Sequence, residues 1–354
     1  KKLVQHPSNR EFFFAATQTG LYVSSNRGKS WSAQSDGLDF SNIGSLTVTD
    51  NFVYVGTLGG GVYSGRINSD NSISWLESNG PYPQIHNIQI KVDPTDSNVL
   101  YATSFPGGVF KSVDRGVTWL ESNFALPSFG VSDPNSLGYY NLELNPTNSQ
   151  ELYLGIFGKG VYHSTDGAAT WMPMYRLKNK NVYSVSVDPR GEMVFASTNG
   201  QPSIYTNSIG SNSWDEVKTI GNPWTIVSSI AINPTNNKEL YVAGFPGGLF
   251  KSTDEGESWF EVSNGIIFNK KFVTGIGFEN FYYNVVIHPT RPNEIYLSGY
   301  LGDVYKSVDG GKSWSDYSQG LVKGGIITDL EVDPSGNTLI ISQKAGGVSL
   351  RGLE

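Results

Sequence analysis

The chain has 354 residues, of which 41 are glycine, 13% are aromatic and 16% are charged. This composition is typical of a turn-rich all-β protein and argues against a helical or disordered one. The net charge of −7 and the lack of a run of lysine and arginine argue against nucleic acid as a partner. The absence of cysteine excludes disulfides, thiolate catalysis and cysteine-ligated zinc.

Residues 1–4 (Lys-Lys-Leu-Val) do not form a signal peptide, and no apolar run reaches the length of a transmembrane helix. The chain starts inside its first repeat, so we expect that an upstream segment was removed. We predict an extracytoplasmic protein, secreted or attached to the surface of a bacterium or archaeon, that is not inserted in a membrane.

Tryptophan marks an internal repeat. Seven of the eight tryptophans recur at intervals of 43 to 55 residues: Trp31, Trp75, Trp119, Trp171, Trp214, Trp259 and Trp314. A period near 44 residues is the length of a propeller blade, and the two longest intervals each carry an insertion of roughly ten residues. First strands are predicted near residues 3, 46, 90, 142, 185, 230, 285 and 330, most of them ending at turns such as Asp93-Pro94.

Each period contains four short alternating segments separated by turn residues, which predicts a four-stranded antiparallel blade. Strand counting gives seven complete blades plus three strands of an eighth that ends at Leu350. We therefore predict one all-β domain, an eight-bladed β-propeller over residues 1–354. Its blades are expected at about 1–36, 43–78, 87–123, 139–175, 182–218, 227–263, 282–318 and 327–354. A seven-bladed ring with an appended sheet, and a fragment of a larger ring, are the alternatives.

A turn of the form Ser-x-Asp-x-Gly-x-x-Trp is expected between the third and fourth strands, the fourth starting at the tryptophan. It is complete at residues 112–119, 252–259 and 307–314, with near copies at 164–171 and 24–31. The aspartate is expected to accept backbone N–H bonds, the glycine to adopt positive φ, and the tryptophan to fill the space between blades. Because unpaired backbone donors explain the carboxylate, we interpret the motif as structural. The residues concerned are Asp114, Trp119, Asp166, Trp171, Asp254, Trp259, Asp309 and Trp314.

This motif resembles the Asp-box, or bacterial neuraminidase repeat, of sialidase-like β-propellers, and the resemblance covers nearly the whole chain. The chain also resembles the propellers of two-propeller xyloglucan-degrading glycoside hydrolases, which share the box, the Asn-Pro-Thr turns and the third strand that follows Gly-Gly. It is similar to the lone propellers of photosystem II assembly factors and to sortilin-type receptors. The arginine cluster and Arg-Ile-Pro signature of sialidases, the arginine-rich patch of the assembly factors and the cysteine-rich module of sortilins do not occur here.

The two ends of each predicted blade differ. One end holds the short polar turns, and the other holds the loop between the second and third strands, the connections between blades and both insertions. Insertions in a repeat usually lie on the binding face, where aromatic residues suit sugar stacking or a protein contact. The alternative for each ring is that it caps the apolar rim. The candidate ligand-binding residues are Tyr82, Phe105, Phe129, Phe157, Trp224, Phe245, Phe272 and Tyr300.

A glycoside hydrolase requires two carboxylates about 5–10 Å apart. The speculative catalytic residues on the same face are Asp303, Asp133 and Glu279. The family resemblance implies a catalytic aspartate in a Thr-Asp-x-Gly-Gly loop, but the matching residues 103–108 contain none. The four histidines are scattered and no phosphate-cradling glycine loop is present, so we expect neither a metal nor a cofactor.

We therefore predict an extracellular or surface-associated binding or scaffold propeller that holds a glycan or protein partner on its aromatic face. The alternative is a xyloglucanase-like glycoside hydrolase acting on β-glucan, or a fragment of one. An assembly factor for a protein complex is the second alternative. Whether the chain is an enzyme stays open at this point, with a non-enzymatic role favoured, and so does its oligomeric state.

Overall fold

The computed structural model describes residues 2–38, 42–57, 59–76, 86–105, 107–127, 140–198, 204–211, 214–216, 220, 226–245, 248–266, 284–299, 302–323, 327–333, 335–343 and 347–353. The chain divides into two compact units, Lys1–Gly191 (unit 1) and Glu192–Glu354 (unit 2).

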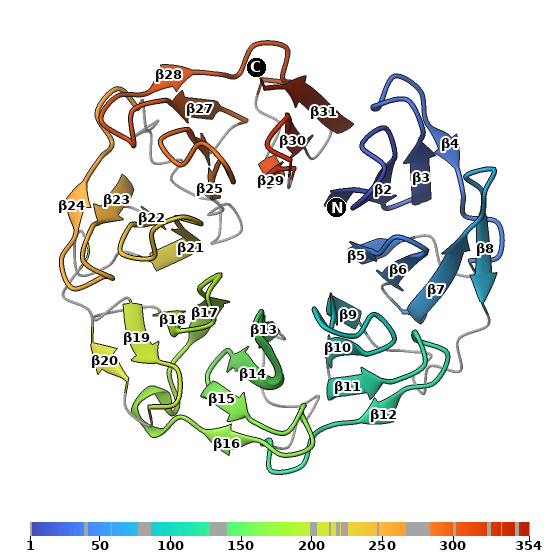
Figure 1. The fold of residues 1–354 in the computed structure, drawn as a ribbon, viewed down its shortest axis with the longest axis horizontal. Coiled ribbons are helices and arrows are strands. Elements are labelled where there is room, and N and C mark those ends of the chain that lie inside the picture. The colour runs from blue at the N-terminus through green and yellow to red at the C-terminus, as the bar shows by residue number, and fades with distance from the viewer. Residues whose placement is uncertain are drawn as a thin grey trace, which may run out of the picture. The chain divides into compact units, whose positions relative to one another are not determined.

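Unit 1 contains four four-stranded sheets and the first strand of a fifth (Figure 1). Blade 1 consists of β1 (Lys2–Gln5), β2 (Phe13–Thr17), β3 (Gly20–Ser24) and β4 (Ser32–Ala33), and blade 2 of β5 (Ile43–Val48), β6 (Phe52–Thr57), β7 (Gly61–Ile67) and β8 (Ile73–Leu76). Blade 3 consists of β9 (His86–Val92), β10 (Leu100–Phe105), β11 (Gly108–Ser112) and β12 (Leu120–Glu121). Blade 4 consists of β13 (Tyr140–Asn145), β14 (Asn148–Ile156), β15 (Gly160–Ser164) and β16 (Met172–Pro173). The 3-10 turn η1 (Tyr175–Leu177) and β17 (Val182–Val187) follow.

Unit 2 begins with the remaining strands of blade 5, which are β18 (Met193–Thr198), β19 (Ile204–Ser208) and β20 (Asp215–Glu216). Blade 6 consists of β21 (Ile226–Ile232), β22 (Leu240–Phe245), β23 (Gly248–Ser252) and β24 (Phe260–Glu261). Blade 7 consists of β25 (Val285–Ile287), β26 (Ile295–Ser298), β27 (Val304–Ser307) and β28 (Ser315–Asp316). Blade 8 has three strands, β29 (Ile327–Val332), β30 (Thr338–Gln343) and β31 (Gly347–Gly352). The predicted all-β fold with eight propeller blades, the last of three strands, is confirmed.

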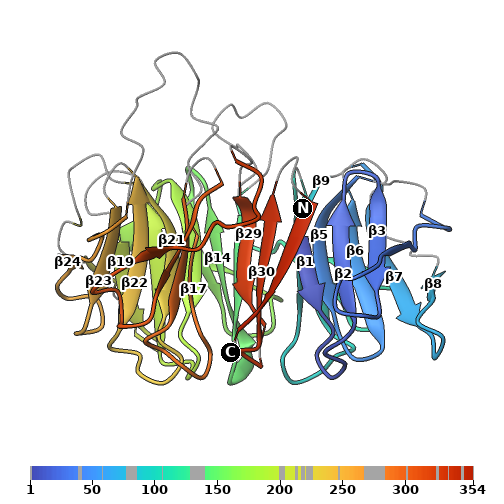
Figure 2. The same cartoon turned by 90° about the horizontal axis from the view of Figure 1, so that it is seen from above.

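The strands of each blade follow one another in chain order, so each blade has two distinct ends. We call the end with the turns after the first and third strands the turn end. The loop end holds the loop between the second and third strands and the connection to the next blade. Figure 2 shows β1, β2 and β3 of blade 1 running between these two ends.

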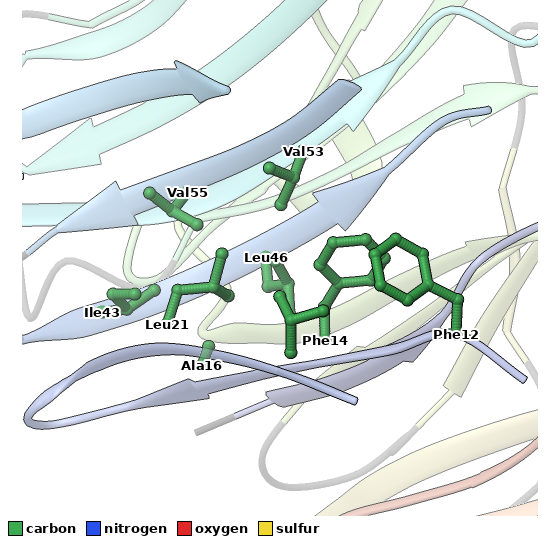
Figure 3. Packing of buried hydrophobic residues seen from close by; sticks show 9 residues of the cluster. Phe12, Phe14, Ala16, Leu21, Ile43, Leu46, Val53 and Val55 are labelled. Atoms are coloured by element: carbon green, nitrogen blue, oxygen red, sulfur yellow. The ribbon is translucent and has the colours of Figure 1, made fainter. Parts of the chain in front are cut away.

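The cores lie between neighbouring sheets, which explains why the middle strands are apolar on both faces. In β14, every residue from Leu152 to Ile156 is buried. Between blades 1 and 2, Phe12, Phe14 and Leu21 pack against Leu46 and Val53 (Figure 3). Burial of each such side chain stabilises the fold by roughly 1.5–3 kcal/mol.

The fourth strand begins one residue after the box tryptophan, so the prediction that it starts at the tryptophan is wrong for the blades with an Asp-box. The reason is that the tryptophan still belongs to the turn. The indole Nε1 of Trp119 donates to the carbonyl of Gly116, 3.1 Å away. In blade 2, residues 67–73 form a hairpin without a box, and β8 (Ile73–Leu76) includes Trp75.

Indole N–H groups also join neighbouring blades. Trp75 donates to the Gln34 carbonyl at 2.9 Å and Trp171 donates to the Ser122 carbonyl at 2.8 Å. Each acceptor is the residue that follows the fourth strand of the preceding blade. Trp314 bonds in the same way to Val262, at 2.7 Å.

Blade 8 has no fourth strand among the described residues, and Arg351 of β31 takes over this contact. Tyr317 is the residue that follows β28, and its carbonyl accepts a hydrogen bond from Nη1 of Arg351. The guanidinium also donates to the Gln319 carbonyl and lies 4.8 Å from the centroid of the Tyr317 ring. Arginine therefore replaces tryptophan as the donor at the junction of blades 7 and 8.

Histidine replaces Asp or Asn at the first turn of blades 1 and 7. The Nδ1 of His288 accepts the N–H of Arg291 at 3.0 Å, so the proton lies on Nε2, which donates to the Gly336 carbonyl of blade 8 at 2.7 Å. In blade 4 the amide of Asn145 has the same two roles, accepting from the N–H of Thr147 and donating to the Gly191 carbonyl. His288 is fully buried, and both of its ring nitrogens have hydrogen-bond partners.

Candidate ligand-binding site

In the Asp-box turns, the aspartate and serine side chains form hydrogen bonds with other groups of the same turn. In blade 3, Asp114 Oδ1 accepts the backbone N–H of Thr118 at 2.8 Å, and Oδ2 accepts the Thr118 hydroxyl at 2.5 Å. The Ser112 hydroxyl donates to Asp114 Oδ1 and accepts the N–H of Gly116, both at 2.8 Å. The same pattern recurs at Asp166, Asp254 and Asp309.

These hydrogen bonds keep the box carboxylates ionised. The Ser313 hydroxyl and N–H lower the pKa of Asp309 to about 2. At Asp114 burial acts in the opposite direction, but the bonds from Thr118, Ser112 and Val117 together outweigh it and leave the pKa below its ordinary value. A carboxylate held ionised in this way is unsuited to donate a proton near neutral pH.

Two consecutive left-handed residues shape each box, whereas the sequence pattern predicted one, the glycine. In blade 3 these are Arg115 (φ 62°) and Gly116 (φ 80°). In blade 4 they are Gly167 and Ala168, whose φ is 70° although alanine carries a Cβ. The glycine there has moved to the first of the two positions, which explains how the turn forms without glycine at the second.

Of the predicted ligand-binding residues, Phe157 is fully described, and it lies at the loop end of blade 4. Phe105 and Phe245 are the last residues of β10 and β22, and their side chains lie outside the described residues. Seven further candidates also lie outside the described residues: Tyr82, Phe129, Asp133, Trp224, Phe272, Glu279 and Tyr300.

Three aromatic residues lie at the loop end of blade 4 and β17. Phe157 lies in the loop between β14 and β15, half-exposed, and its ring meets that of Tyr183 edge-on, with the centroids 5.5 Å apart. Tyr183 is on β17 and is also half-exposed. Tyr175, the first residue of η1, is 78% exposed. We call Phe157, Tyr175 and Tyr183 the aromatic platform.

The backbone beneath the aromatic platform is closely packed. Leu177 is fully buried and anchors η1. Its carbonyl oxygen approaches Gly160 so closely that a Cβ there would lie 2.2 Å from it. The N–H of Asn179 donates to the carbonyl of Lys159 at 3.4 Å, which ties the blade connection to the β14–β15 loop. The platform is therefore built on two segments that are fixed to each other.

Asp303 lies in the loop between β26 and β27 of blade 7 and is half-buried. Burial, together with the negative charge of Asp316, raises its pKa. Asp316 pairs with Tyr305 across β27 and β28, and the Ser318 hydroxyl and N–H lower its pKa. Asp303 therefore lies near a carboxylate that the sequence reading did not consider, while Asp133 and Glu279 are outside the described residues.

The sequence reading also missed Tyr175 and Tyr183. Tyr175 lies in the connection between blades 4 and 5, and Tyr183 lies on β17, just after that connection. No insertion lengthens the repeat there. The candidates Tyr82 and Trp224 also lie in blade connections in the sequence, and this signal could have found Tyr175, whereas Tyr183 on β17 had no such signal.

Within the described ranges, no group of three or more His, Asp or Glu side chains is arranged to hold a metal ion. In the same part of the chain, no helix is long and apolar enough to cross a membrane.

Comparison with known proteins supports the Asp-box resemblance. A family model described as "Photosynthesis system II assembly factor YCF48" matches residues 138–273. A xyloglucanase of Hypocrea jecorina is 25% identical over 407 residues, an alignment that covers 94% of this chain and 44% of that protein. The chain spans less than half the length of the curated relatives it matches.

Solved structures show the same fold at low identity. The GH74 xyloglucanase from Xanthomonas campestris has a TM-score of 0.63 at 16% identity, covering 96% of this chain and 57% of that one. A structure of YCF48 bound to D1 peptide has a TM-score of 0.54 at 14% identity, covering 100% of this chain and 96% of that one. The predicted resemblance to Asp-box propellers of both kinds is confirmed.

Proposed function

We propose that this chain is a carbohydrate-binding propeller, one domain over residues 1–354, that acts outside the cytoplasm and holds a polysaccharide on its loop ends. The observation that carries the proposal is the aromatic platform. Tyr175 is 78% exposed, and the half-exposed rings of Phe157 and Tyr183 meet edge-on at the same loop end. Rigidly mounted aromatic faces are the groups on which pyranose rings stack.

The curated relatives support a glycan as the ligand. They are named as xyloglucanases, and the match to the Hypocrea jecorina protein extends over 94% of this chain. A xyloglucan is therefore the first polysaccharide to test. The turn ends offer a poorer surface, because their carboxylates already accept hydrogen bonds from the turn itself.

The test is calorimetric titration of the chain with xyloglucan. We expect Tyr175→Ala and Tyr183→Ala each to weaken binding about tenfold, since loss of one aromatic contact costs up to roughly 1.4 kcal/mol. Phe260→Ala is the matched control, because Phe260 is 48% exposed but lies on β24, away from the loop ends. Equal affinity of all three variants, or no binding by the wild type, would rule the platform out.

A glycoside hydrolase is the second candidate, and Asp303 favours it. Its pKa is raised by burial and by Asp316, whereas that of Asp316 is lowered by Ser318. Two carboxyl groups whose environments separate their pKa values are the usual pair for acid and base roles. Release of reducing ends from xyloglucan, abolished in Asp303→Asn, would replace the binding proposal with this one.

An assembly factor is the third candidate, favoured by the match of residues 138–273 to the YCF48 family model. In that case the loop ends would hold a peptide. Capture of peptides by the wild type, with no polysaccharide bound, would favour this role.

A further inference from the structure

Four positively charged residues lie on the same two segments as the aromatic platform. Lys159 comes from the β14–β15 loop, and Arg176, Lys178 and Lys180 come from η1 and the connection that follows it. The sequence separates Lys159 from the other three, but the hydrogen bond from Asn179 N–H to the Lys159 carbonyl joins the two segments. We call these four residues the cationic surface.

The two stretches of sequence that contain the cationic surface have no acidic residue of their own. Neither residues 157–165 nor residues 172–187 contain Asp or Glu. The acids that follow these stretches are Asp166, in an Asp-box, and Asp188, in a first-strand turn, so both lie at the turn end. The whole chain carries a net charge of −7, so this surface is opposite in sign to the molecule that bears it.

The exposure of these cations fits binding of a ligand from solvent. Arg176 and Lys178 are exposed, while Lys159 and Lys180 are half-buried. A single exposed ion pair contributes little to affinity, so a ligand gains substantially only when several of its anions meet several cations. A polymer with repeated carboxylates satisfies this condition, and its sugar rings suit the neighbouring aromatic side chains.

We propose that the polysaccharide held by this chain carries carboxylates, as a uronic-acid-bearing glycan does, and that the cationic surface binds them while the aromatic platform stacks its rings. This inference rests on the proposed carbohydrate-binding function and names the class of its ligand. Nucleic acid fits less well, because the remainder of the chain carries a net negative charge that opposes a long polyanion.

The experiment compares xyloglucan with the same polymer oxidised at its C6 hydroxyls to carboxylates, which changes charge and leaves the backbone linkage unchanged. We expect the wild type to bind the oxidised polymer at least tenfold more tightly at low ionic strength. The gain should shrink as salt is added, since exposed charges are screened over about 8 Å at 0.15 M.

The variant Arg176→Gln/Lys178→Gln should lose the preference for the oxidised polymer and keep its affinity for the neutral one. Lys178→Arg, which retains the charge, should keep the preference. Lys29→Gln is the matched control, an exposed cation in the turn of blade 1 at residues 24–31.

Three results would overturn the inference. Equal affinity for the two polymers would do so while leaving the proposed function in place. A preference that survives Arg176→Gln/Lys178→Gln would place the anions elsewhere on the protein. Failure to bind either polymer would remove the inference and the proposed function together.

Discussion

The two ends of blade 4 differ in their side chains. The turn end has a hydrogen-bonded carboxylate, and the loop end has exposed aromatic and cationic residues. At the turn end, Asp166 accepts the backbone N–H of Thr170 at 2.9 Å and the hydroxyls of Thr170 and Ser164. At the loop end, Tyr175 is 78% exposed, and the same end carries cations from two segments. Groups whose surface is covered by the turn mainly stabilise the fold, whereas exposed groups held on a fixed backbone can also contact a ligand.

The distinction also changes how the motif residues are read. The box aspartates attract attention as catalytic candidates, yet their surroundings hold them ionised and occupied. The loop-end residues have no motif of their own. In this chain the most regular residues are therefore structural, and we look for function among residues that the repeat does not specify.

The largest expected effect is on stability, from Trp171→Ala at a blade junction. Trp171 is 1% exposed, and its indole bonds to the Ser122 carbonyl of blade 3. Truncating a buried aromatic residue costs about 3–5 kcal/mol. We expect a large drop in the urea midpoint, measured by tryptophan fluorescence and far-UV circular dichroism. A midpoint close to that of the wild type would show that the junction does not depend on this residue.

His288→Ala should lower the free energy of unfolding by about 1–3 kcal/mol. The reason is that the N–H of Arg291 and the carbonyl of Gly336 would lose their buried hydrogen-bond partner. His288→Asn should recover most of it, since Asn145 performs the same two roles in blade 4. Chemical denaturation of both variants is the measurement. The account of the turn end is wrong if Asn is no better than Ala.

Arg351→Ala should lower the free energy of unfolding by about 1–2 kcal/mol, because the carbonyls of Tyr317 and Gln319 lose a charged hydrogen-bond donor. Arg351→Lys should restore only part of the loss, since an ammonium lacks the planar fork that reaches two carbonyls. Thermal denaturation of the three proteins measures this order. Equal stability of the lysine and arginine forms would contradict the bidentate contact.

The smallest effect is a pH dependence at Asp309. Its folded pKa of about 2 lies below the value of about 3.9 for an unfolded aspartate, so folding favours the ionised form. Its contribution to stability is therefore complete above about pH 4 and is lost as the pH falls toward 2. Asp309→Asn should reduce the acid sensitivity of the urea midpoint in this window. An unchanged pH profile would show that the carboxylate does not couple to folding.

The sequence predicts the scaffold well because its signals are local and periodic. The spacing of tryptophan, the alternation of each strand and the turn after it give the eight blades and even the missing fourth strand of blade 8. The first of the two left-handed residues of each box was missed, because Arg115 and Glu255 adopt positive φ without being glycine. Arg351 was missed because it matches the tryptophans in hydrogen bonding rather than in residue type.

The candidate site was predicted less completely, for a different reason. Phe157 follows from the loop-end argument, but the cationic surface depends on Lys159 lying beside residues 176–180, and only the folded chain brings these together. The effect of the Asp316 charge on Asp303 depends likewise on the register of β27 and β28, which places Asp316 opposite Tyr305. Residues that meet through tertiary packing leave no periodic trace in the sequence.

The most direct test of the account compares Asp166→Asn with Tyr175→Ala, one from each end of blade 4, by xyloglucan titration and urea denaturation of the same samples. We expect Asp166→Asn to lower the urea midpoint and keep the glycan affinity, and Tyr175→Ala to keep the midpoint and weaken binding about tenfold. Loss of binding in a folded Asp166→Asn, together with full binding by Tyr175→Ala, would contradict the assignment of stability to the turn end and of function to the loop end.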